Sequence, residues 1–254
     1  MQSLTQENLS QLKQLRTELT RFTAVYKFAL DEVNTKINIL KEEFSYIHDY
    51  NPIEHCNSRL KSPESILKKV YKKNIDFSLE SIKESVKDIA GIRITCSFKS
   101  DIYALSDMIE KQKDIELVER KDYIKNPKPN GYQSLHLIVK VPVFLSDREE
   151  SVCVEIQIRT IAMDFWASLE HKIYYKYDKE IPSRLADELK AATDSAAALD
   201  EKMESIHNEV KELKDERENA QLDEVFDVSS MTATRDKFMQ GILQQLIEKP
   251  KKLK

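Results

Sequence analysis

The sequence predicts an α+β or α/β fold in which a mixed β-sheet of about four or five strands lies between helices at both ends of the chain. Three patterns predict this arrangement. Apolar residues recur at three- and four-residue spacing over residues 4–48, which is typical of a long amphipathic helix. Apolar and polar residues alternate over residues 92–98 and 152–159, which is typical of strands with one buried face. A heptad spacing of apolar residues over residues 183–215 predicts a second long helix.

The composition is that of a globular protein without a general affinity for nucleic acids or membranes. The 254 residues carry a net charge of −4 and 41% of them are hydrophobic, which leaves room for one domain with helical extensions or for two small domains. No apolar run approaches about 18 residues, and the N-terminus does not resemble a signal peptide. Cys56, Cys96 and Cys153 lack metal-ligand spacing and are expected to be free thiols. We therefore expect a soluble, cytoplasmic protein.

After a break at residues 51–52, a strongly basic segment covers residues 59–73. Within it, Ser62 and Pro63 suit the N-cap and the first position of a helix. The basic residues of this segment fit two alternatives, a solvated helix face or an anion site. The anion site would be formed by four residues around the start of the helix: Arg59, Lys61, Ser65 and Lys69.

A short helix is predicted over residues 79–87, and a strand over residues 92–98 follows it. Asp88 lies directly before this strand. A single aspartate in such a place usually belongs to a turn or cap. Asp88 becomes a candidate site residue because a second carboxylate, Glu155, lies on another predicted strand. Two carboxylates from neighbouring strands can hold Mg²⁺ and orient phosphates.

A helix from Ser100 and a strand over residues 115–119 lead into an unusual loop. The loop holds Pro127, Pro129 and Gly131 in a chain that has only 7 prolines and 3 glycines. Because proline fixes φ and glycine permits positive φ, the loop is expected to be a shaped surface. It also carries the positive charge and the aromatic ring that a phosphorylated ligand with a base requires: Lys121, Lys125, Lys128, Asn130 and Tyr132.

Two further strands are predicted after this loop. In the first, three polar side chains share a face: Tyr132, Ser134 and His136. In the second, a polar face lies opposite an apolar one: Glu155, Gln157 and Arg159. A half-solvated sheet face is the common explanation of such a pattern. However, burying a carboxylate in mid-strand without a cation or metal costs energy, which favours a site. Thr160 is the expected cap of the next helix.

The last predicted helix carries an apolar seam with alternating steps of four and three residues: Leu185, Leu189, Ala192, Ala196, Leu199, Met203, Ile206, Val210 and Leu213. The seam would pack against the N-terminal helix of the same chain or against another subunit. Residues after 215 are polar, and we expect them to be partly disordered. The predicted division is a helical extension over residues 1–50, a core over 51–180, a packing helix over 181–220 and a polar tail over 221–254.

Three motifs occur in a fixed order: KDIAGIRI at residues 87–94, KPNGYQSLH at 128–136 and EIQIRT at 155–160. Over about residues 50–215 the chain resembles the small alarmone synthetases, which are single-domain (p)ppGpp synthetases or GTP diphosphokinases, and most of all their RelP-like branch. The resemblance implies a nucleotidyltransferase-like mixed sheet of about five strands flanked by helices, with N- and C-terminal helical extensions. It also implies transfer of a pyrophosphoryl group from ATP to the 3′-hydroxyl of GTP or GDP with Mg²⁺, giving AMP and pppGpp or ppGpp. Members of the family form homotetramers, so a homo-oligomer is implied as well.

The resemblance also implies a role for each motif. Asp88 would bind Mg²⁺, and Glu155 would help to hold the metal or accept the proton of the 3′-hydroxyl. Four residues would bind ATP: Arg59, Lys61, Ser65 and Lys69. Five would bind the guanine nucleotide, with the tyrosine stacking on the base: Lys121, Lys128, Asn130, Tyr132 and His136. Leu60 departs from the pattern of bifunctional relatives, which often have proline there.

Only about 50 residues precede the synthetase-like region, so the resemblance leads us to expect synthesis of the alarmone without its hydrolysis. Two other hypotheses remain. An enzyme of the same fold would transfer a nucleotidyl group to another acceptor, and it would release pyrophosphate instead of AMP. A non-catalytic module, either a coiled-coil assembly or an RNA-binding protein that uses the basic helix, would lose nothing when Asp88 is replaced by Asn.

Overall fold

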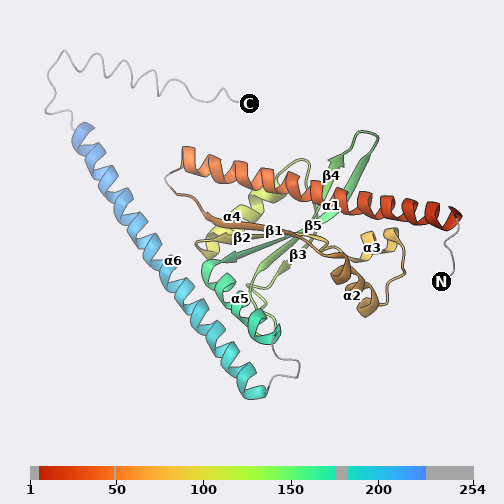
Figure 1. Ribbon diagram of the computed structural model, residues 1–254. Helices are drawn as coiled ribbons and strands as arrows, with labels where there is room; N and C mark the ends of the chain where they lie inside the picture. The colour runs from red at the N-terminus through yellow and green to blue at the C-terminus, as the bar shows by residue number, and fades with distance from the viewer. Residues whose placement is uncertain (1–5, 49, 176–181, 227–254) are drawn as a thin grey trace, which may run out of the picture. The chain divides into compact units, whose positions relative to one another are not determined.

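The computed structural model describes residues 6–48, 50–175 and 182–226 (Figure 1). The chain divides into two compact units, residues 1–204 and 205–254. The first unit contains the whole described sheet, and the described part of the second unit is the end of the last helix. Everything that bears on the candidate site lies in the first unit.

Five strands and six helices make up the described residues. The strands are β1 (Ile53–Leu60), β2 (Ala90–Cys96), β3 (Glu116–Asp122), β4 (Leu135–Phe144) and β5 (Glu149–Thr160). The helices are α1 (Gln6–Ile47), α2 (Pro63–Lys73), α3 (Leu79–Ser85), α4 (Lys99–Glu110), α5 (Ile161–Tyr175) and α6 (Ser183–Phe226). This order confirms the expected α+β fold with helices before and after the sheet.

The strands form one sheet in the order β1-β2-β5-β4-β3, so β5 lies at its centre. Strands β2 and β5 are parallel, and the other three neighbouring pairs are antiparallel. The sheet is therefore mixed, as predicted. On one side of β5, Gly91 of β2 pairs with Glu155, and on the other side His136 of β4 pairs with Gln157. Paired residues point to the same face of a sheet, so β2, β5 and β4 together build one polar face.

The opposite face of the sheet is the hydrophobic core. Its central strand contributes three side chains with almost no solvent exposure: Val154, Ile156 and Ile158. Helix α1 contacts β1, β2, β4 and β5, while α4 contacts β2 and β5. Buried residues of both helices join the same cluster, among them Val33, Ile37, Ile102 and Leu105. Burying a side chain of this size contributes about 1.5–3 kcal/mol, so this layer holds the site's scaffold in place.

Two helix caps agree with the sequence, and a third helix begins at a slightly different residue. The Ser62 hydroxyl accepts a hydrogen bond from the Ser65 amide at 3.3 Å and so caps α2, with Pro63 as its first residue. The Thr160 hydroxyl accepts from the Met163 amide at 3.1 Å and caps α5. Helix α4 begins slightly earlier than predicted, because the Asp101 carboxylate accepts from the Phe98 amide at 3.0 Å.

The structure differs from the expectations in several places. Strand β1 was not expected, because it is an edge strand and apart from Ile53 its side chains are exposed or only partly buried. Strand β4 begins at Leu135 and not at Tyr132, since the Lys128 amide donates to Tyr132 and the Gly131 amide to Lys128, which keeps these residues in a turn. Lys121 belongs to β3 and not to the loop. Helix α6 continues to Phe226, so part of the polar tail is helical. Residues 227–254 of that tail lie outside the described residues.

Candidate active site

The polar face of the sheet brings together residues from all three sequence motifs. Gly91 and Arg93 of β2 pair with Glu155 and Gln157 of β5, and His136 of β4 pairs with Gln157 from the other side. At the edges, Arg59 of β1 pairs with Gly91, and Lys121 of β3 pairs with His136. The alternation read from the sequence thus becomes one surface. Its donors and acceptors come from every strand.

Asp88 lies in the turn before β2, where two lysines hold its carboxylate. Lys61 Nζ is 2.6 Å from Asp88 Oδ2, and Lys69 Nζ is 2.7 Å from Asp88 Oδ1. Lys61 follows β1 and Lys69 lies on α2, so the cap at Ser62 fixes the turn that joins them. Burial by itself would raise the pKa of Asp88, but the two lysines outweigh it and keep that pKa below its ordinary value. Asp88 is therefore ionised at neutral pH.

Glu155 is held on the same face by its neighbours on β4 and β5. His136 Nδ1 lies 3.2 Å from Glu155 Oε1, and Gln157 Nε2 donates to Glu155 Oε2 at 2.8 Å. Burial raises the pKa of Glu155, yet the hydrogen bonds from His136 and Gln157 bring it below the ordinary value. The negative charge of Asp88 acts in the opposite direction, so the two carboxylates are close enough to influence each other.

Tyr132 connects the loop to this carboxylate through His136. The Tyr132 hydroxyl is 2.8 Å from His136 Nε2 and accepts a hydrogen bond from Arg159 Nη2 at 2.5 Å. An ionised carboxylate can only accept, so the imidazole hydrogen is assigned to Nδ1, which faces Glu155, and Nε2 then accepts a hydrogen bond from the tyrosine hydroxyl. Lys128 Nζ lies 4.7 Å from the centre of the Tyr132 ring. A flat ring, a cation and an ionised carboxylate are thereby linked in one network.

The sequence placed Arg159 on the polar face of the second strand but gave it no role, and it did not assign Arg93 or Asp164 to the site. Asp164 of α5 contacts Arg93 at 3.4 Å and Arg159 at 3.1 Å. The Nε atoms of Arg93 and Arg159 are buried and have no hydrogen-bond partner among the described residues. Burial and the nearby charge of Arg159 lower the pKa of Arg93. One carboxylate between two arginines leaves excess positive charge, which suits an anionic ligand. Knowledge of the strand register would have identified Arg93 as a site residue, because the register pairs Arg93 with Gln157 and so places it on the same polar face.

The remaining predicted residues lie at the borders of this face. Arg59 is exposed at the end of β1, and its charge is felt by Arg93. Lys121 Nζ pairs with Glu119 at 2.8 Å. Asn130 Nδ2 donates to Glu170 of α5 at 3.1 Å, and its Oδ1 accepts from the Tyr132 amide, which stabilises the turn. The Ser65 hydroxyl is engaged with Ser62 in the cap of α2.

The carboxylates of this face are suited to a hard cation. Within the described ranges there is no group of three or more His, Cys, Asp or Glu side chains that could hold a metal ion. Mg²⁺, however, commonly uses one or two carboxylates together with substrate phosphates and waters. Asp88 and Glu155 are both ionised and electrostatically coupled, so the donor set fits Mg²⁺ bound together with a polyphosphate.

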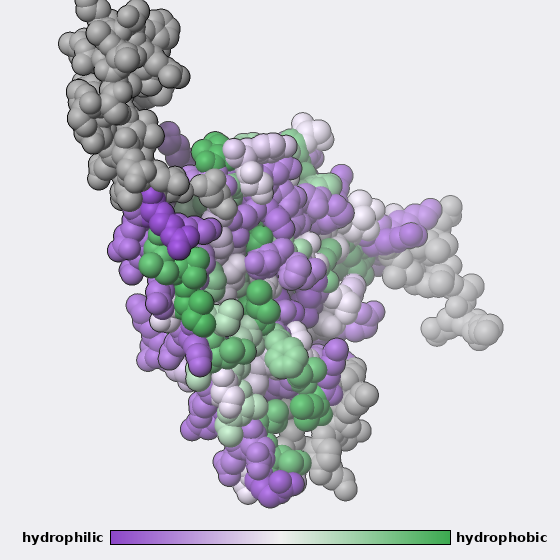
Figure 2. All heavy atoms as spheres, turned by 90° about the vertical axis from the view of Figure 1, so that its left-hand side faces the viewer, coloured by the Kyte–Doolittle hydropathy of each residue, from purple (hydrophilic) through white to green (hydrophobic). Residues whose placement is uncertain are grey.

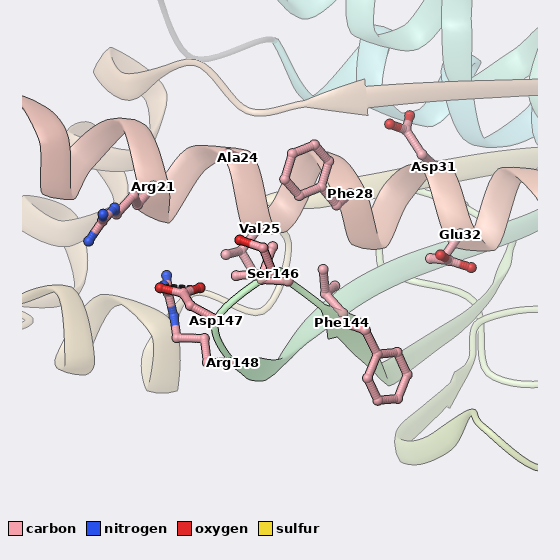
Figure 3. A pocket seen from close by; sticks show the side chains of 12 residues that line it. Arg21, Ala24, Val25, Phe28, Asp31, Glu32, Phe144, Ser146, Asp147 and Arg148 are labelled. Atoms are coloured by element: carbon pink, nitrogen blue, oxygen red, sulfur yellow. Dashed lines mark hydrogen bonds and ion pairs between the residues drawn. The ribbon is translucent and has the colours of Figure 1, made fainter.

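A separate hollow of about 650 Å³ lies between α1 and the hairpin of β4 and β5 (Figure 3). Figure 3 shows Arg21 and Phe28 on the helix, with Phe144 and Arg148 on the hairpin. None of the residues predicted for the site lines this hollow.

Among the described helices, none is both long enough and apolar enough to span a membrane.

Comparisons with known proteins identify the family and the fold. A family model described as "Region found in RelA / SpoT proteins" matches residues 58–180. The chain is 52% identical over 203 residues to the GTP pyrophosphokinase YwaC of Bacillus subtilis (strain 168), covering 80% of this chain and 97% of that protein. The crystal structure of the small alarmone synthetase 2 from Bacillus subtilis has a TM-score of 0.70 and 52% identity, covering 76% of this chain and 99% of that one.

The small alarmone synthetase 1 from Bacillus subtilis is also similar, in structures with two different ligands. Bound to its product pppGpp, it has a TM-score of 0.71 and 39% identity, covering 76% of this chain and 98% of that one. Bound to AMPCPP, it has a TM-score of 0.66 and 37% identity, covering 77% of this chain and 99% of that one. The two ligands are those expected of a protein that uses both an adenine and a guanine nucleotide.

Proposed function

The chain belongs to the RelA/SpoT family as a small alarmone synthetase, and we propose that it is a GTP pyrophosphokinase that uses ATP and GTP or GDP. The 3′-oxygen of the guanine nucleotide forms a bond to the β-phosphorus of ATP, the bond from that phosphorus to the oxygen retained by AMP breaks, and AMP leaves. GTP gives pppGpp and GDP gives ppGpp. One observation carries the proposal: hydrogen bonds join Tyr132 through His136 to an ionised Glu155.

The guanine nucleotide binds on the β3–β4 side of Glu155. Tyr132 offers its ring to the base, while Asn130 and His136 provide hydrogen-bonding groups beside it. Lys121 and Lys128 neutralise the phosphates of the acceptor. Glu155 accepts the proton of the 3′-hydroxyl, because it is ionised and each of its oxygens keeps a further lone pair.

ATP binds on the β1–α2 side, beside Asp88. Lys61 and Lys69 already lie on this carboxylate and are long enough to turn toward phosphates when ATP arrives. Arg59 and Ser65 border the same region, and Arg93 adds a further cation next to it. Phosphoryl-type transfer depends mainly on the alignment of the reactants and on neutralisation of their charge. These cations are therefore the main contribution of the ATP-binding side to catalysis.

We propose that Asp88, with Glu155 beside it, holds Mg²⁺ together with the ATP phosphates. The ion would neutralise part of the polyphosphate charge and polarise the reacting phosphoryl oxygens. The lysines on Asp88 keep the carboxylate ionised and in place before the nucleotide binds.

The test is a product assay with labelled ATP, GTP or GDP, and Mg²⁺. We expect AMP and a guanosine penta- or tetraphosphate, and release of pyrophosphate instead of AMP would exclude the proposed reaction in favour of nucleotidyl transfer. Asp88→Asn and Glu155→Gln should each reduce kcat by at least about 100-fold. The matched control is Glu149→Gln, which changes an exposed glutamate on the same strand and should keep parental activity.

We also propose that the protein assembles as a homo-oligomer, in keeping with the homotetramers implied by the resemblance. Leu199 is 56% exposed and Met203 is 49% exposed, and the same spacing continues with exposed Ile206, Val210 and Leu213. Figure 2 shows green, apolar side chains gathered in a band on the face that it presents. Light scattering after gel filtration should give a smaller particle for Leu199→Glu than for Ser195→Glu, and equal masses would count against this seam.

The substrates and the thiols support a cytoplasmic location. Cys56, Cys96 and Cys153 are all free, as expected for a reducing compartment. ATP and guanine nucleotides are available in the cytoplasm. Fractionation of cells that produce the tagged chain should recover it with cytoplasmic proteins, and recovery with the membrane or the medium would contradict the proposal.

A further inference from the structure

Helix α6 lies directly against the loop that carries Tyr132. Gly131 has a φ of +87°, and a Cβ placed on it would lie 2.6 Å from Thr193 Oγ1 and 3.0 Å from Thr193 Cβ. Thr193 is buried, and its hydroxyl already donates to the Leu189 carbonyl at 3.2 Å within the helix. The contact between loop and helix is therefore steric, with the threonine side chain acting as a stop for the glycine backbone.

The same face of α6 contacts the polar strand at a second point. Asp200 lies seven residues after Thr193 and thus on the same side of the helix. It accepts a hydrogen bond of 2.5 Å from the Thr160 hydroxyl, and both residues are buried. Thr160 directly follows Arg159, which donates to the Tyr132 hydroxyl. Helix α6 therefore supports both the backbone beside Tyr132 and the strand end that binds its hydroxyl.

Little free space separates these elements. The gap among Gly131, Thr193, Asp200 and the α5 side chains Met163 and Trp166 is about 10 Å³, which is no larger than one water molecule requires. Trp166 Nε1 also donates to the Leu189 carbonyl at 3.0 Å, which fixes α6 against α5. A change of side-chain volume at position 193 must therefore move either the helix or the loop, and loops in general yield more readily than packed helices.

We infer that Thr193 and Asp200 are positioning residues for the guanine nucleotide, because they set where Gly131 and Arg159 place the ring of Tyr132. The inference rests on the proposed function, since it concerns the acceptor half of the same site. Among the described residues, the contacts of Thr193 and Asp200 reported above are with Gly131, Leu189 and Thr160, whereas the lysines of the β1–α2 half contact Asp88. Substitution of Thr193 or Asp200 should therefore weaken use of GTP or GDP selectively and leave use of ATP nearly unchanged.

The decisive comparison is Thr193→Leu against Ser195→Leu. Ser195 lies two residues further along α6, is exposed, and makes the same kind of hydrogen bond, to the Ala191 carbonyl at 3.0 Å. Thr193→Leu should raise KM for GTP about tenfold or more and change KM for ATP by less than about twofold, because it displaces only the acceptor loop. Calorimetry with GDP alone should give the same loss of affinity. Ser195→Leu should match the parent, and Thr193→Ser, which keeps the hydroxyl, should restore most of the affinity.

Two further variants keep the inference testable if Thr193→Leu does not fold. Thr193→Ala removes the stop without adding volume and should raise KM for GTP about two- to fivefold. Asp200→Asn keeps the shape of the side chain but replaces the carboxylate that accepts the hydrogen bond of Thr160 with an amide. It should therefore also raise KM for GTP. If Thr193→Leu and Thr193→Ala both keep the parental KM for GTP, or raise KM for ATP equally, the inference is wrong. If the parent protein makes no guanosine penta- or tetraphosphate, the proposed function fails first and the inference falls with it.

Discussion

Replacing His136 with Leu should separate the ring that we propose binds the base from the carboxylate that we propose accepts the proton. The substitution removes the contact with the Tyr132 hydroxyl at 2.8 Å and the one with Glu155 at 3.2 Å. A neutral hydrogen bond contributes about 0.5–1.5 kcal/mol and one to a charged group about 1.5–3 kcal/mol, so the total is about 2–4.5 kcal/mol. If both bonds act in the transition state, kcat/KM for GTP should fall about 30- to 2,000-fold.

The same variant makes a prediction about pH with a defined sign. In the parent, burial raises the pKa of Glu155, and the hydrogen bond from His136 is the first influence that lowers it again. Without His136 the pKa of Glu155 must rise, and the carboxylate then needs a higher pH to be ionised. The acidic limb of the profile of kcat/KM against pH should therefore move to higher pH.

Tyr132→Phe is the matched control for this prediction. It removes the hydroxyl but keeps the ring and leaves the bond between His136 and Glu155 in place. Its acidic limb should stay where the parent's lies, while KM for GTP rises because Arg159 and His136 no longer hold the ring. An acidic limb of His136→Leu that stays in place, or moves to lower pH, would show that Glu155 is not the group that titrates.

Three further predictions concern stability and the loop. Ile156→Ala should lower the free energy of unfolding in urea by about 2–5 kcal/mol, whereas Ile161→Ala, at a position 52% exposed, should cost less than about 0.5 kcal/mol. The lowered pKa of Asp88 means that its ionised form stabilises the fold above the ordinary value of 3.8, and this contribution is lost as pH falls further. Unfolding at a series of pH values should therefore show a smaller loss of stability in acid for Asp88→Asn than for the parent. Gly131→Ala combines an unfavourable positive φ with a clash against α6, so calorimetry should show weaker binding of GDP, by about tenfold or more.

The parts of the fold that the sequence predicts are those with strong periodicity. Helix α1 and the two central strands follow from apolar spacing, because a large core must be built from them. Strand β1 has one fully buried position, Ile53, and lies at the sheet edge, so its pattern carries little signal. The start of β4 depends on a turn that is closed by the amides of Lys128 and Gly131, and periodicity does not record such bonds.

The site could be predicted where a residue is chemically unusual for its position. A carboxylate in the middle of a buried strand identified Glu155, and its register with β2 brings the strand that follows Asp88 alongside it. The ion pairs of Asp164 with Arg93 and Arg159 could not be predicted in this way. The two arginines lie on different strands and approach Asp164 only after the sheet has formed. Contacts such as that of Thr193 with Gly131 depend on how a distant helix packs, and no local pattern encodes them.

The order of strands fits the proposal that the two nucleotides approach from different sides. With β5 in the centre, β1 and α2 bring their lysines to Asp88 on one flank, while the loop before β4 brings Tyr132 to the other. Between these flanks, Arg93 and Arg159 share a single carboxylate, Asp164, and the charge of Arg159 lowers the pKa of Arg93. Repulsion of this kind weakens the unliganded fold, and the phosphates of the two proposed substrates would relieve it.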